Sequence, residues 1–355
     1  MKRKKEHVEI ALSQKVQGSH NFWQDISFVH NSLPEINKED VNLKTEFFGR
    51  YLNFPFIIAS MTGGYEEAIQ INENLARAAE KLGIGFGIGS ERALFKNDFV
   101  KSYTVVRKYK IPVKMANLGA PQLIDQKGEE ALNLDEIEEA VKIIDANFLA
   151  IHLNFLQEIV QPGGETRAKG IINAIGKVVS SLDVPVIVKE TGGGISRNCA
   201  ERLKSVGVEC IDVGGTGGTS FAAIEQYRAK AMGSDLLQHM GRVFWNWGIP
   251  SPISVGELRN QDLKIVASGG IRSGLDVARA IASGADLASA AYPFLSPATK
   301  GYKEVIALVE VYMEEFRNAM FLLGVEDVRA LKNVKTLTTG RLYEWGRGMK
   351  NAGNL

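Results

Sequence analysis

The chain has only two cysteines, Cys199 and Cys210, among its 355 residues. Two cysteines cannot supply a disulfide framework, and they fit a reducing, cytoplasmic setting. Charge of one sign is also not in excess, because 42 Lys and Arg residues are balanced by 41 Asp and Glu residues, which leaves a formal net charge of +1. This balance argues against a general surface for nucleic acid or membrane.

Long hydrophobic runs are also absent, since the apolar stretches are too short and too often interrupted to span a bilayer. A small basic arm at residues 3–7 is followed by Glu9 and Gln14 rather than by an apolar segment, so we expect no signal peptide. The overall hydrophobic content of 45% is nevertheless ordinary for a globular protein. The length is compatible with one α/β barrel that carries insertions.

From residue 56 onward, apolar segments typical of buried strands alternate with helical patterns. The predicted strands are residues 56–60, 84–88, 113–117, 148–153, 184–189, 209–213, 265–268 and 287–291. The predicted helices between them are residues 66–81, 98–109, 134–147, 169–181, 196–206 and 273–283. Eight such units predict a (β/α)₈ TIM barrel, because an open doubly wound sheet rarely needs eight and has no reason to repeat so evenly.

We expect one barrel domain at residues 56–298, preceded by an arm and lead-in at 1–55 with a helix-like opening at 7–13. C-terminal helices follow at 299–355, and the first of them, at 302–323, has a predicted packing face of Val305, Leu308, Val309, Val311 and Tyr312. About 50 residues separate the sixth strand from the seventh, and a long connection at the ligand end of a barrel is usually a lid or a subunit contact.

Residues 151–162 are dense in polar side chains where the fourth strand ends: His152, Asn154, Gln157, Glu158 and Gln161. In parallel α/β folds, ligands bind at the carboxyl ends of strands. A lone carboxylate among neutral donors suits Mg²⁺, which is often held by one or two carboxylates together with substrate phosphates. The alternative is a polar loop whose groups cap one another.

The strongest local signal is the glycine-rich segment 267–274, which follows the seventh strand and opens a helix. Glycines let the backbone approach a phosphate, and a helix N-terminus supplies unpaired N–H groups. Barrel enzymes often bind phosphate here, so we favour a phosphate site over a simple turn. Lys189, at the end of the fifth strand, is expected to face the barrel mouth rather than to pair with Glu190, because neighbours in a strand point to opposite faces.

An ordered series of motifs resembles that of the type 2 isopentenyl diphosphate isomerases. The motifs lie at residues 3–7, 61–64, 89–92, 116–120, 152–162, 189–190, 217–220, 247–250 and 268–272. The basic arm combined with His-x-Asn-x-x-Gln-Glu at 152–158 is the most specific part. The resemblance implies an FMN enzyme on a (β/α)₈ barrel that interconverts isopentenyl and dimethylallyl diphosphate, with Mg²⁺ and with FMN kept reduced by NADPH. It also implies a cytoplasmic homo-oligomer, a tetramer or octamer, without nucleic-acid or membrane partners.

The resemblance also implies roles for individual residues. FMN would be bound by Ser60, Met61, Thr62, Ser90, Asn117, Lys189, Thr219, Gly269, Gly270, Ile271, Arg272, Ala290 and Ala291. The diphosphate would be bound by Arg3, Lys4, His7, Ser90, Arg92, His152, Asn154 and Gln157. Glu158 would ligate Mg²⁺. The groups nearest to the chemistry would be Gln157, His152 and Glu225, the last as a second metal ligand or a proton-transfer group.

Three departures from the family pattern stand out. Glu91 replaces a common Gln and is expected to add a negative charge beside the diphosphate pocket. Phe221 replaces a common Trp, and residues 163–167 read Gly-Gly-Glu-Thr-Arg where Glu-Gly-Asp-Arg is usual.

Two other functions remain open from the sequence. One is an FMN-dependent oxidoreductase of the 2-hydroxyacid oxidase type, which would need a histidine base after the seventh strand, where this chain has none. The other is a non-catalytic phosphate-binding barrel.

Overall fold

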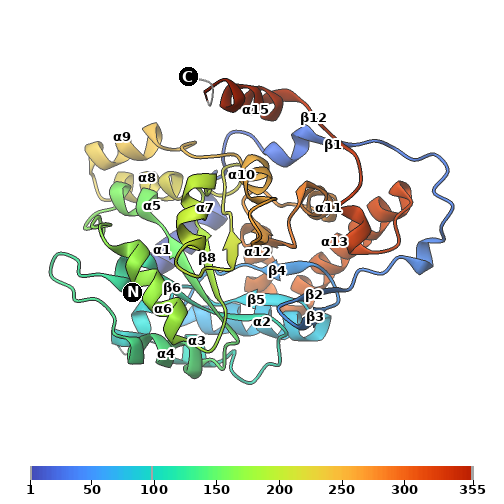
Figure 1. Cartoon of the computed structure of the whole chain (residues 1–355). Coiled ribbons are helices and arrows are strands. Elements are labelled where there is room, and N and C mark those ends of the chain that lie inside the picture. The colour runs from blue at the N-terminus through green and yellow to red at the C-terminus, as the bar shows by residue number, and fades with distance from the viewer. Residues whose placement is uncertain (1, 97–98, 353–355) are drawn as a thin grey trace.

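The computed structural model describes residues 2–96 and 99–352, and its centre is a closed barrel of eight parallel strands (Figure 1). The barrel order is β10-β11-β4-β5-β6-β7-β8-β9. The strands are β4 (Phe56–Ile58), β5 (Gly85–Gly87), β6 (Lys114–Gly119), β7 (Phe148–Leu153), β8 (Val186–Glu190), β9 (Cys210–Asp212), β10 (Lys264–Ala267) and β11 (Leu287–Ala290). Each lies within two residues of a predicted segment at both ends, so the predicted TIM barrel is confirmed.

Helices surround the barrel, as Figure 1 shows. Those between successive strands include α2 (Glu67–Leu82), α4 (Leu134–Ile143), α6 (Ile171–Ser181), α7 (Arg197–Lys204) and α11 (Gly274–Ser283). Leu75, Ala78 and Ala79 of α2 are buried, as their spacing predicts. Helix α4 ends earlier than predicted, and a tight turn with a positive φ of 54° at Asp145 leads back to the barrel.

The predicted helix 98–109 is the least accurate assignment. Its first residue, Asp98, lies outside the described residues, and the chain then forms only the short helix α3 (Lys101–Thr104) and turns. The run Thr104-Val105-Val106 is β-branched, which lowers helix propensity, and Pro112 follows soon after.

Four helices near the carboxyl ends of the strands were not expected. Helix α5 (Phe155–Val160) follows β7 directly, where the sequence suggested only a polar stretch. The long connection between β9 and β10 folds into α8 (Phe221–Ala231), α9 (Asp235–Val243) and α10 (Ser251–Leu258). The segment is therefore largely helical rather than an open loop.

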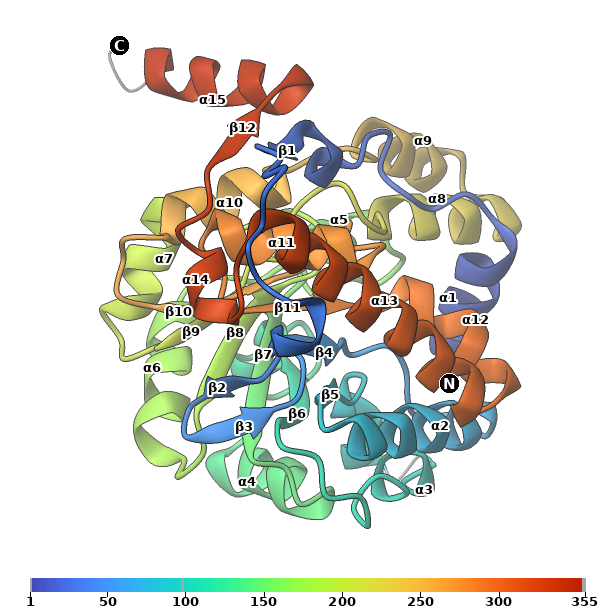
Figure 2. The same cartoon turned by 90° about the vertical axis from the view of Figure 1, so that its right-hand side faces the viewer.

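The C-terminal part packs on the outside of the barrel. Helix α12 (Tyr292–Lys300) leads to α13 (Tyr302–Leu323), which contacts α2, α11 and α12 (Figure 2). The buried residues of α13 are Val305, Val309, Tyr312, Phe316, Ala319 and Met320. Val311 is 50% exposed, so its assignment to the packing face is wrong: it lies about 200° around the helix from Val309.

Segments near the two ends of the chain pair with each other outside the barrel. Strand β1 (Ile26–Phe28) pairs antiparallel with β12 (Thr336–Thr338), and α14 (Val328–Leu331) and α15 (Gly340–Ala352) complete the C-terminal segment. Helix α1 (Lys2–Ser13) is longer than the predicted 7–13 and includes the whole basic arm. Its Ala11 and the following Val16 pack with Ala223 and Ile224 of α8 and Leu295 of α12.

The amino-terminal end of the barrel is closed by a hairpin of β2 (Thr45–Phe47) and β3 (Arg50–Leu52). Phe47 and Leu52 are fully buried against a ring of barrel residues that includes Ile57, Met115 and Phe148. This end is thus filled with side chains. None of the described helices combines the length and apolarity that a bilayer crossing requires.

Candidate active site

A cavity of about 280 Å³ opens at the carboxyl ends of the strands, beneath helix α1. Every residue that the sequence predicted for FMN or diphosphate contributes to its lining, and so does the predicted metal ligand Glu158. These residues come from the carboxyl ends of the eight strands or from the segments that follow them, and from α1 and α5. Only Glu225 of the predicted set lies outside the lining.

Helix α1 brings cationic side chains to the mouth of the cavity. Lys4 Nζ donates hydrogen bonds to the main-chain oxygen of Ser90 and, at 2.9 Å, to the hydroxyl of Tyr103. Burial, helped by the charge of Arg3, lowers the pKa of Lys4 to about 7. Lys4 therefore lies beside Ser90, which is predicted to bind the diphosphate. The pKa of Lys4 is close to neutral pH.

Glu225 lies behind His7 rather than in the cavity. Its two oxygens contact His7 Nε2 at 2.7 Å and Arg228 Nη1 at 2.5 Å, and the side chain has no solvent exposure. Arg228 also binds Glu6 at 3.0 Å, so α1 is tied to α8 by a buried charged network. Burial lowers the pKa of His7 despite the carboxylate beside it. Glu225 therefore contacts the cavity residue His7 from outside the cavity.

Asn117 and His152 form a hydrogen-bonded pair in the cavity wall. Asn117 Nδ2 donates to the main-chain oxygen of Ile88 at 3.1 Å, so its Oδ1 faces His152 Nδ1, 2.6 Å away. His152 therefore carries its hydrogen on Nδ1 when neutral. Burial and then the charges of Lys189 and Lys4 lower the pKa of His152 to about 3, so the ring is neutral at pH 7.

Glu91 is buried beneath this pair and is absent from the cavity lining. Its Oε2 accepts the main-chain N–H of Asn117 at 2.8 Å. Burial raises the pKa of Glu91 to about 8. Burial therefore favours a neutral carboxyl at this position, and the negative charge expected beside the pocket stays a prediction.

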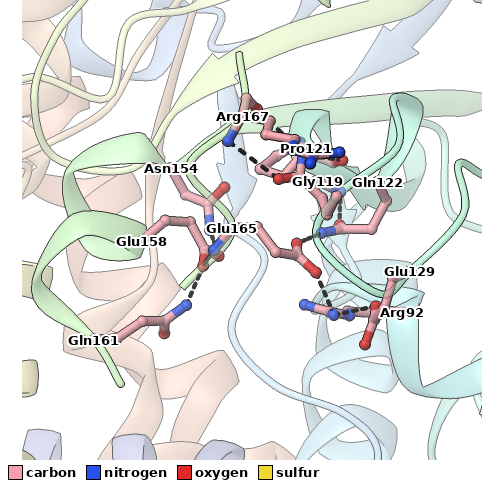
Figure 3. Close-up of polar contacts among 11 residues, drawn as sticks. Arg92, Gly119, Pro121, Gln122, Glu129, Asn154, Glu158, Gln161, Glu165 and Arg167 are labelled. Atoms are coloured by element: carbon pink, nitrogen blue, oxygen red, sulfur yellow. Dashed lines mark hydrogen bonds and ion pairs between the residues drawn. The ribbon is translucent and has the colours of Figure 1, made fainter. Parts of the chain in front are cut away.

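The wall formed by α5 and the loop after it is shown in Figure 3. Glu158 Oε1 accepts from Asn154 Nδ2 at 2.8 Å, and Oε2 accepts from Gln161 Nε2 and from the main-chain N–H of Glu165 at 2.8 Å. This loop passes so close that a Cβ on Gly164 would meet the main-chain oxygen of Glu158 at 1.8 Å. The carboxylate is thus held firmly at the cavity edge.

This wall fits a hard cation. Asn154 is only 6% exposed, yet its Oδ1 has no hydrogen-bond partner among the described residues. A buried amide oxygen beside a carboxylate is suited to Mg²⁺, which prefers oxygen ligands. No three His, Cys, Asp or Glu side chains converge on a metal site in the part of the chain that the structure describes, so further ligands would have to come from substrate or water.

Arg92 lies on the same wall but is engaged by acidic side chains. Its Nη2 forms ion pairs with Glu129 and with Glu165 (Figure 3). Glu165 also accepts a hydrogen bond from Gln122 Nε2 at 2.6 Å. Burial raises the pKa of Glu165, and the charge of Arg92 opposes that rise.

The opposite side of the cavity fits a flavin phosphate and ring. Two buried hydroxyls on the lining, Ser60 Oγ and Ser289 Oγ, have no hydrogen-bond partner among the described residues. The glycine-rich loop lines the cavity with positive φ angles of 86° at Gly269 and 89° at Gly270, which only glycine adopts easily. The two hydroxyls and the exposed backbone of the glycine-rich loop could therefore donate hydrogen bonds to a phosphate.

The start of α11 is partly capped from within the protein. Arg272 N donates to Asp276, Gly274 N to Glu315 at 2.6 Å, and Asp276 N to Ser273. Fewer N–H groups than expected are therefore available to a phosphate at this helix end.

Lys189 points into the cavity, as predicted. Its Nζ lies 3.9 Å from Asp212 Oδ2 and donates to the main-chain oxygen of Glu190 at 2.9 Å. The Glu190 carboxyl instead accepts the N–H groups of residues 191–193, and its burial raises its pKa to about 7. The ion-pair partner of Lys189 is thus Asp212, from the neighbouring strand.

Several lining residues were not singled out from the sequence, among them Gln17, Gln122 and Ser289. Gln17 Nε2 donates to Thr219 Oγ1 at 3.1 Å, and its Oε1 accepts from Arg272 at 3.0 Å. Gln122 and Ser289 lie next to strand ends, which is a signal that could have found them. Gln17 carries no such signal, because its contacts are more than 200 residues away.

Comparison with known proteins agrees with this arrangement. The model of the FMN-dependent dehydrogenase family matches residues 10–98 and 162–337. Solved structures of similar fold include a lactate oxidase from Pediococcus acidilactici, with 17% identity, a TM-score of 0.61 and coverage of 90% of this chain and 84% of that one. A mandelate oxidase has 18% identity, a TM-score of 0.61 and coverage of 94% and 95%. The chain therefore belongs to the FMN-dependent dehydrogenase family of barrels.

Curated relatives narrow the assignment. Isopentenyl-diphosphate delta-isomerases from Thermoplasma volcanium and Archaeoglobus fulgidus are 44% and 43% identical to this chain. The first match covers 97% of this chain and 98% of the relative, and the second covers 97% of both. Within its class, the chain belongs to the isopentenyl-diphosphate delta-isomerase family, and the resemblance seen in the sequence is confirmed.

Proposed function

We propose that this protein interconverts isopentenyl diphosphate and dimethylallyl diphosphate, with FMN and Mg²⁺ as cofactors. The observation that carries the proposal is that one cavity is lined both by cationic and amide groups suited to a diphosphate and by Lys189 and the glycine-rich loop suited to a flavin. The relatives that match nearly the whole chain carry the name of this isomerase.

The diphosphate end of the substrate supplies the binding energy, because the hydrocarbon tail has no polar handle. Arg92 presents a planar fork that suits phosphate oxygens, and Arg3 and Lys4 add charge from α1. The neutral side chains of His152 and Asn154 would also contact the diphosphate. The tail would lie against the apolar part of the lining, which includes Val8, Met61, Phe221, Ile224 and Leu295.

Glu158 and Asn154 Oδ1, which has no hydrogen-bond partner within residues 2–96 and 99–352, are the protein groups that would hold Mg²⁺ together with the diphosphate. The metal would neutralise phosphate charge and fix the position of the head group. Glu158 is well suited to this role because three hydrogen bonds orient its carboxylate beforehand.

Reduced FMN would supply the acid and base for moving a proton between two carbons of the allylic system, with no net redox change. Lys189 would lie near the flavin and stabilise its anionic reduced form, with Asp212 balancing the lysine charge. Ser60, Ser289 and the loop 269–272 would hold the cofactor. NADPH would serve as the reductant.

The remaining polar groups differ in how directly they would act on the substrate. Gln157 lines the cavity but cannot titrate, so it would orient or relay a proton rather than be its source. His152, with its low pKa, would bind as a neutral ring. Glu225 would act only through His7, because it lies outside the lining. We further propose a cytoplasmic homo-oligomer.

The direct test is an assay of purified protein with FMN, Mg²⁺ and either NADPH or dithionite. We expect each diphosphate to be converted to the other while the flavin stays reduced, with no flavin oxidised in proportion to the substrate converted. Absence of interconversion by flavin-loaded, folded protein in both directions would refute the proposal.

The oxidase alternative has no structural observation in its favour. Residues 268–283, after the seventh strand, contain no histidine. The likeness to lactate and mandelate oxidases lies below 20% identity and concerns the fold alone. In addition, residues 99–161, which include His152 and Glu158, fall outside the match to the dehydrogenase family. Stoichiometric reduction of the flavin by a 2-hydroxyacid would favour the oxidase instead.

A further inference from the structure

We infer that Glu165 competes with the substrate diphosphate for Arg92 and so limits how tightly the diphosphate end is bound. The inference rests on the proposed function, because it assumes that Arg92 contacts the diphosphate. It assigns a role in setting affinity to a residue on the loop after α5.

The first observation is that Arg92 is already occupied. A single nitrogen, Nη2, forms ion pairs with both Glu129 and Glu165 (Figure 3). The two carboxylates differ in environment, since the Glu129 side chain is 43% exposed and the Glu165 side chain is 8% exposed. Solvent weakens the first pair, whereas the second lies largely within the protein.

The second observation is that Glu165 is fixed and cannot follow Arg92. Its Oε2 accepts from Gln122 Nε2 at 2.6 Å, and its main-chain N–H donates to Glu158 at 2.8 Å. Gln126 then joins the flanking loops, because it donates to the main-chain oxygens of Pro121 and Arg167 and accepts from Arg167 N at 3.1 Å. The loop that carries Glu165 is thus anchored at several points.

A physical consequence follows for the bound state. When a diphosphate takes Nη2 of Arg92, the buried carboxylate of Glu165 loses a charge-assisted hydrogen bond, and water has little access to replace it. The bound diphosphate also places a second negative charge beside Glu165. Part of the attraction between Arg92 and the diphosphate is therefore offset by the cost at Glu165. Removing that carboxylate charge removes this cost.

The test is titration calorimetry of the FMN-loaded protein with inorganic diphosphate as probe, at a fixed saturating concentration of Mg²⁺. We expect Glu165→Gln to bind the probe roughly three- to tenfold more tightly than the wild type, because the amide keeps the shape but not the charge. Glu129→Gln is the matched control, since it removes a charge from the same nitrogen at an exposed position. We expect it to change affinity less than about twofold.

The double-mutant cycle with Arg92→Gln separates competition from general electrostatics. In the Arg92→Gln background, Glu165→Gln should have a clearly smaller effect on affinity, because only the direct repulsion between the carboxylate and the diphosphate remains. The inference is overturned if Glu165→Gln weakens or leaves unchanged the binding of diphosphate, or if its effect is equally large without Arg92. If Glu165→Gln does not fold, as judged by flavin retention and thermal melting, Glu165→Asp is used. Its shorter carboxylate should tighten binding by about twofold, and unchanged or weaker binding would overturn the inference.

The wild-type protein is assayed for turnover and for diphosphate binding in the same series. If the wild-type protein shows neither turnover nor diphosphate binding, both the proposed function and this inference are refuted. Turnover and binding by the wild type, with no tightening in the Glu165 variants, would refute the inference alone.

Discussion

At the amino-terminal end of the barrel, Phe47 and Leu52 of a hairpin fill the space inside the strands. At the carboxyl end, the same eight strands lead into segments that leave a cavity lined by charged and amide groups. Burial of apolar side chains at the amino-terminal end stabilises the fold. At the carboxyl end, poorly solvated carboxyl and amine groups lower the stability of the fold. The contrast teaches that stability and binding are separated along the barrel axis, as is usual for this fold.

The largest effect is expected at the closed end. Phe47→Ala should lower the free energy of unfolding by about 3–5 kcal/mol, because a fully buried ring is removed and leaves a cavity. Urea denaturation would measure this loss. The substrate KM of the folded fraction should stay close to that of the wild type. A KM that rises in step with the loss of stability would show that the two ends are not independent.

At the open end, Glu158→Gln should reduce turnover by at least about 100-fold, because an amide is a weaker ligand for Mg²⁺ than a carboxylate. The assay is the rate of isomerisation against Mg²⁺ concentration, and the thermal melting temperature should change little. Glu130→Gln, which removes an exposed carboxylate on a nearby loop, serves as the control. Unchanged activity and Mg²⁺ response would remove Glu158 from the site.

A smaller effect is expected from Glu91, whose buried carboxyl makes the stability of the protein depend on pH. The pKa of Glu91 is raised from 4.5 to about 8 in the folded protein. Its stabilising contribution is therefore complete below pH 4.5 and is lost as the pH rises through about 8, since only the unfolded state releases the proton early. Glu91→Gln has no such loss. Relative to wild type, it should gain roughly 2 kcal/mol of stability between pH 6 and pH 8.

Denaturation of both proteins at the two pH values measures this difference. A variant whose advantage stayed constant or shrank with pH would mean that Glu91 is ionised in the folded protein. In that case the open end would carry the extra negative charge first expected from the sequence.

The sequence alone predicted the fold well. All eight strands were located because buried parallel strands are short apolar runs, and such runs are a local property of the chain. Errors fell where local signals conflict. The β-branched run Thr104-Val105-Val106 cut short a predicted helix, and Val311 was assigned to the wrong face of α13.

Much of the cavity lining was also predictable: all predicted site residues except Glu225 line the cavity, whereas the lining residue Gln17 carried no local signal. Strand-end residues such as Lys189 and Asn117 were expected to converge, since the carboxyl ends of parallel strands meet at one rim. Their hydrogen-bond partners were not predictable. Lys189 pairs with Asp212 rather than with its neighbour, and burial raises the pKa of Glu91.

What the sequence by itself determined is therefore the repeating βα order, the barrel and the set of groups at its mouth, because periodicity and strand ends are written locally in the chain. Only the tertiary structure decided which of those groups meet, which are buried and which carry charge. Glu165 and Arg92 are 73 positions apart, and their ion pair exists because two separate loops cross the same rim of the barrel. Contacts and solvent exposure of that kind depend on the whole fold, so no local pattern records them.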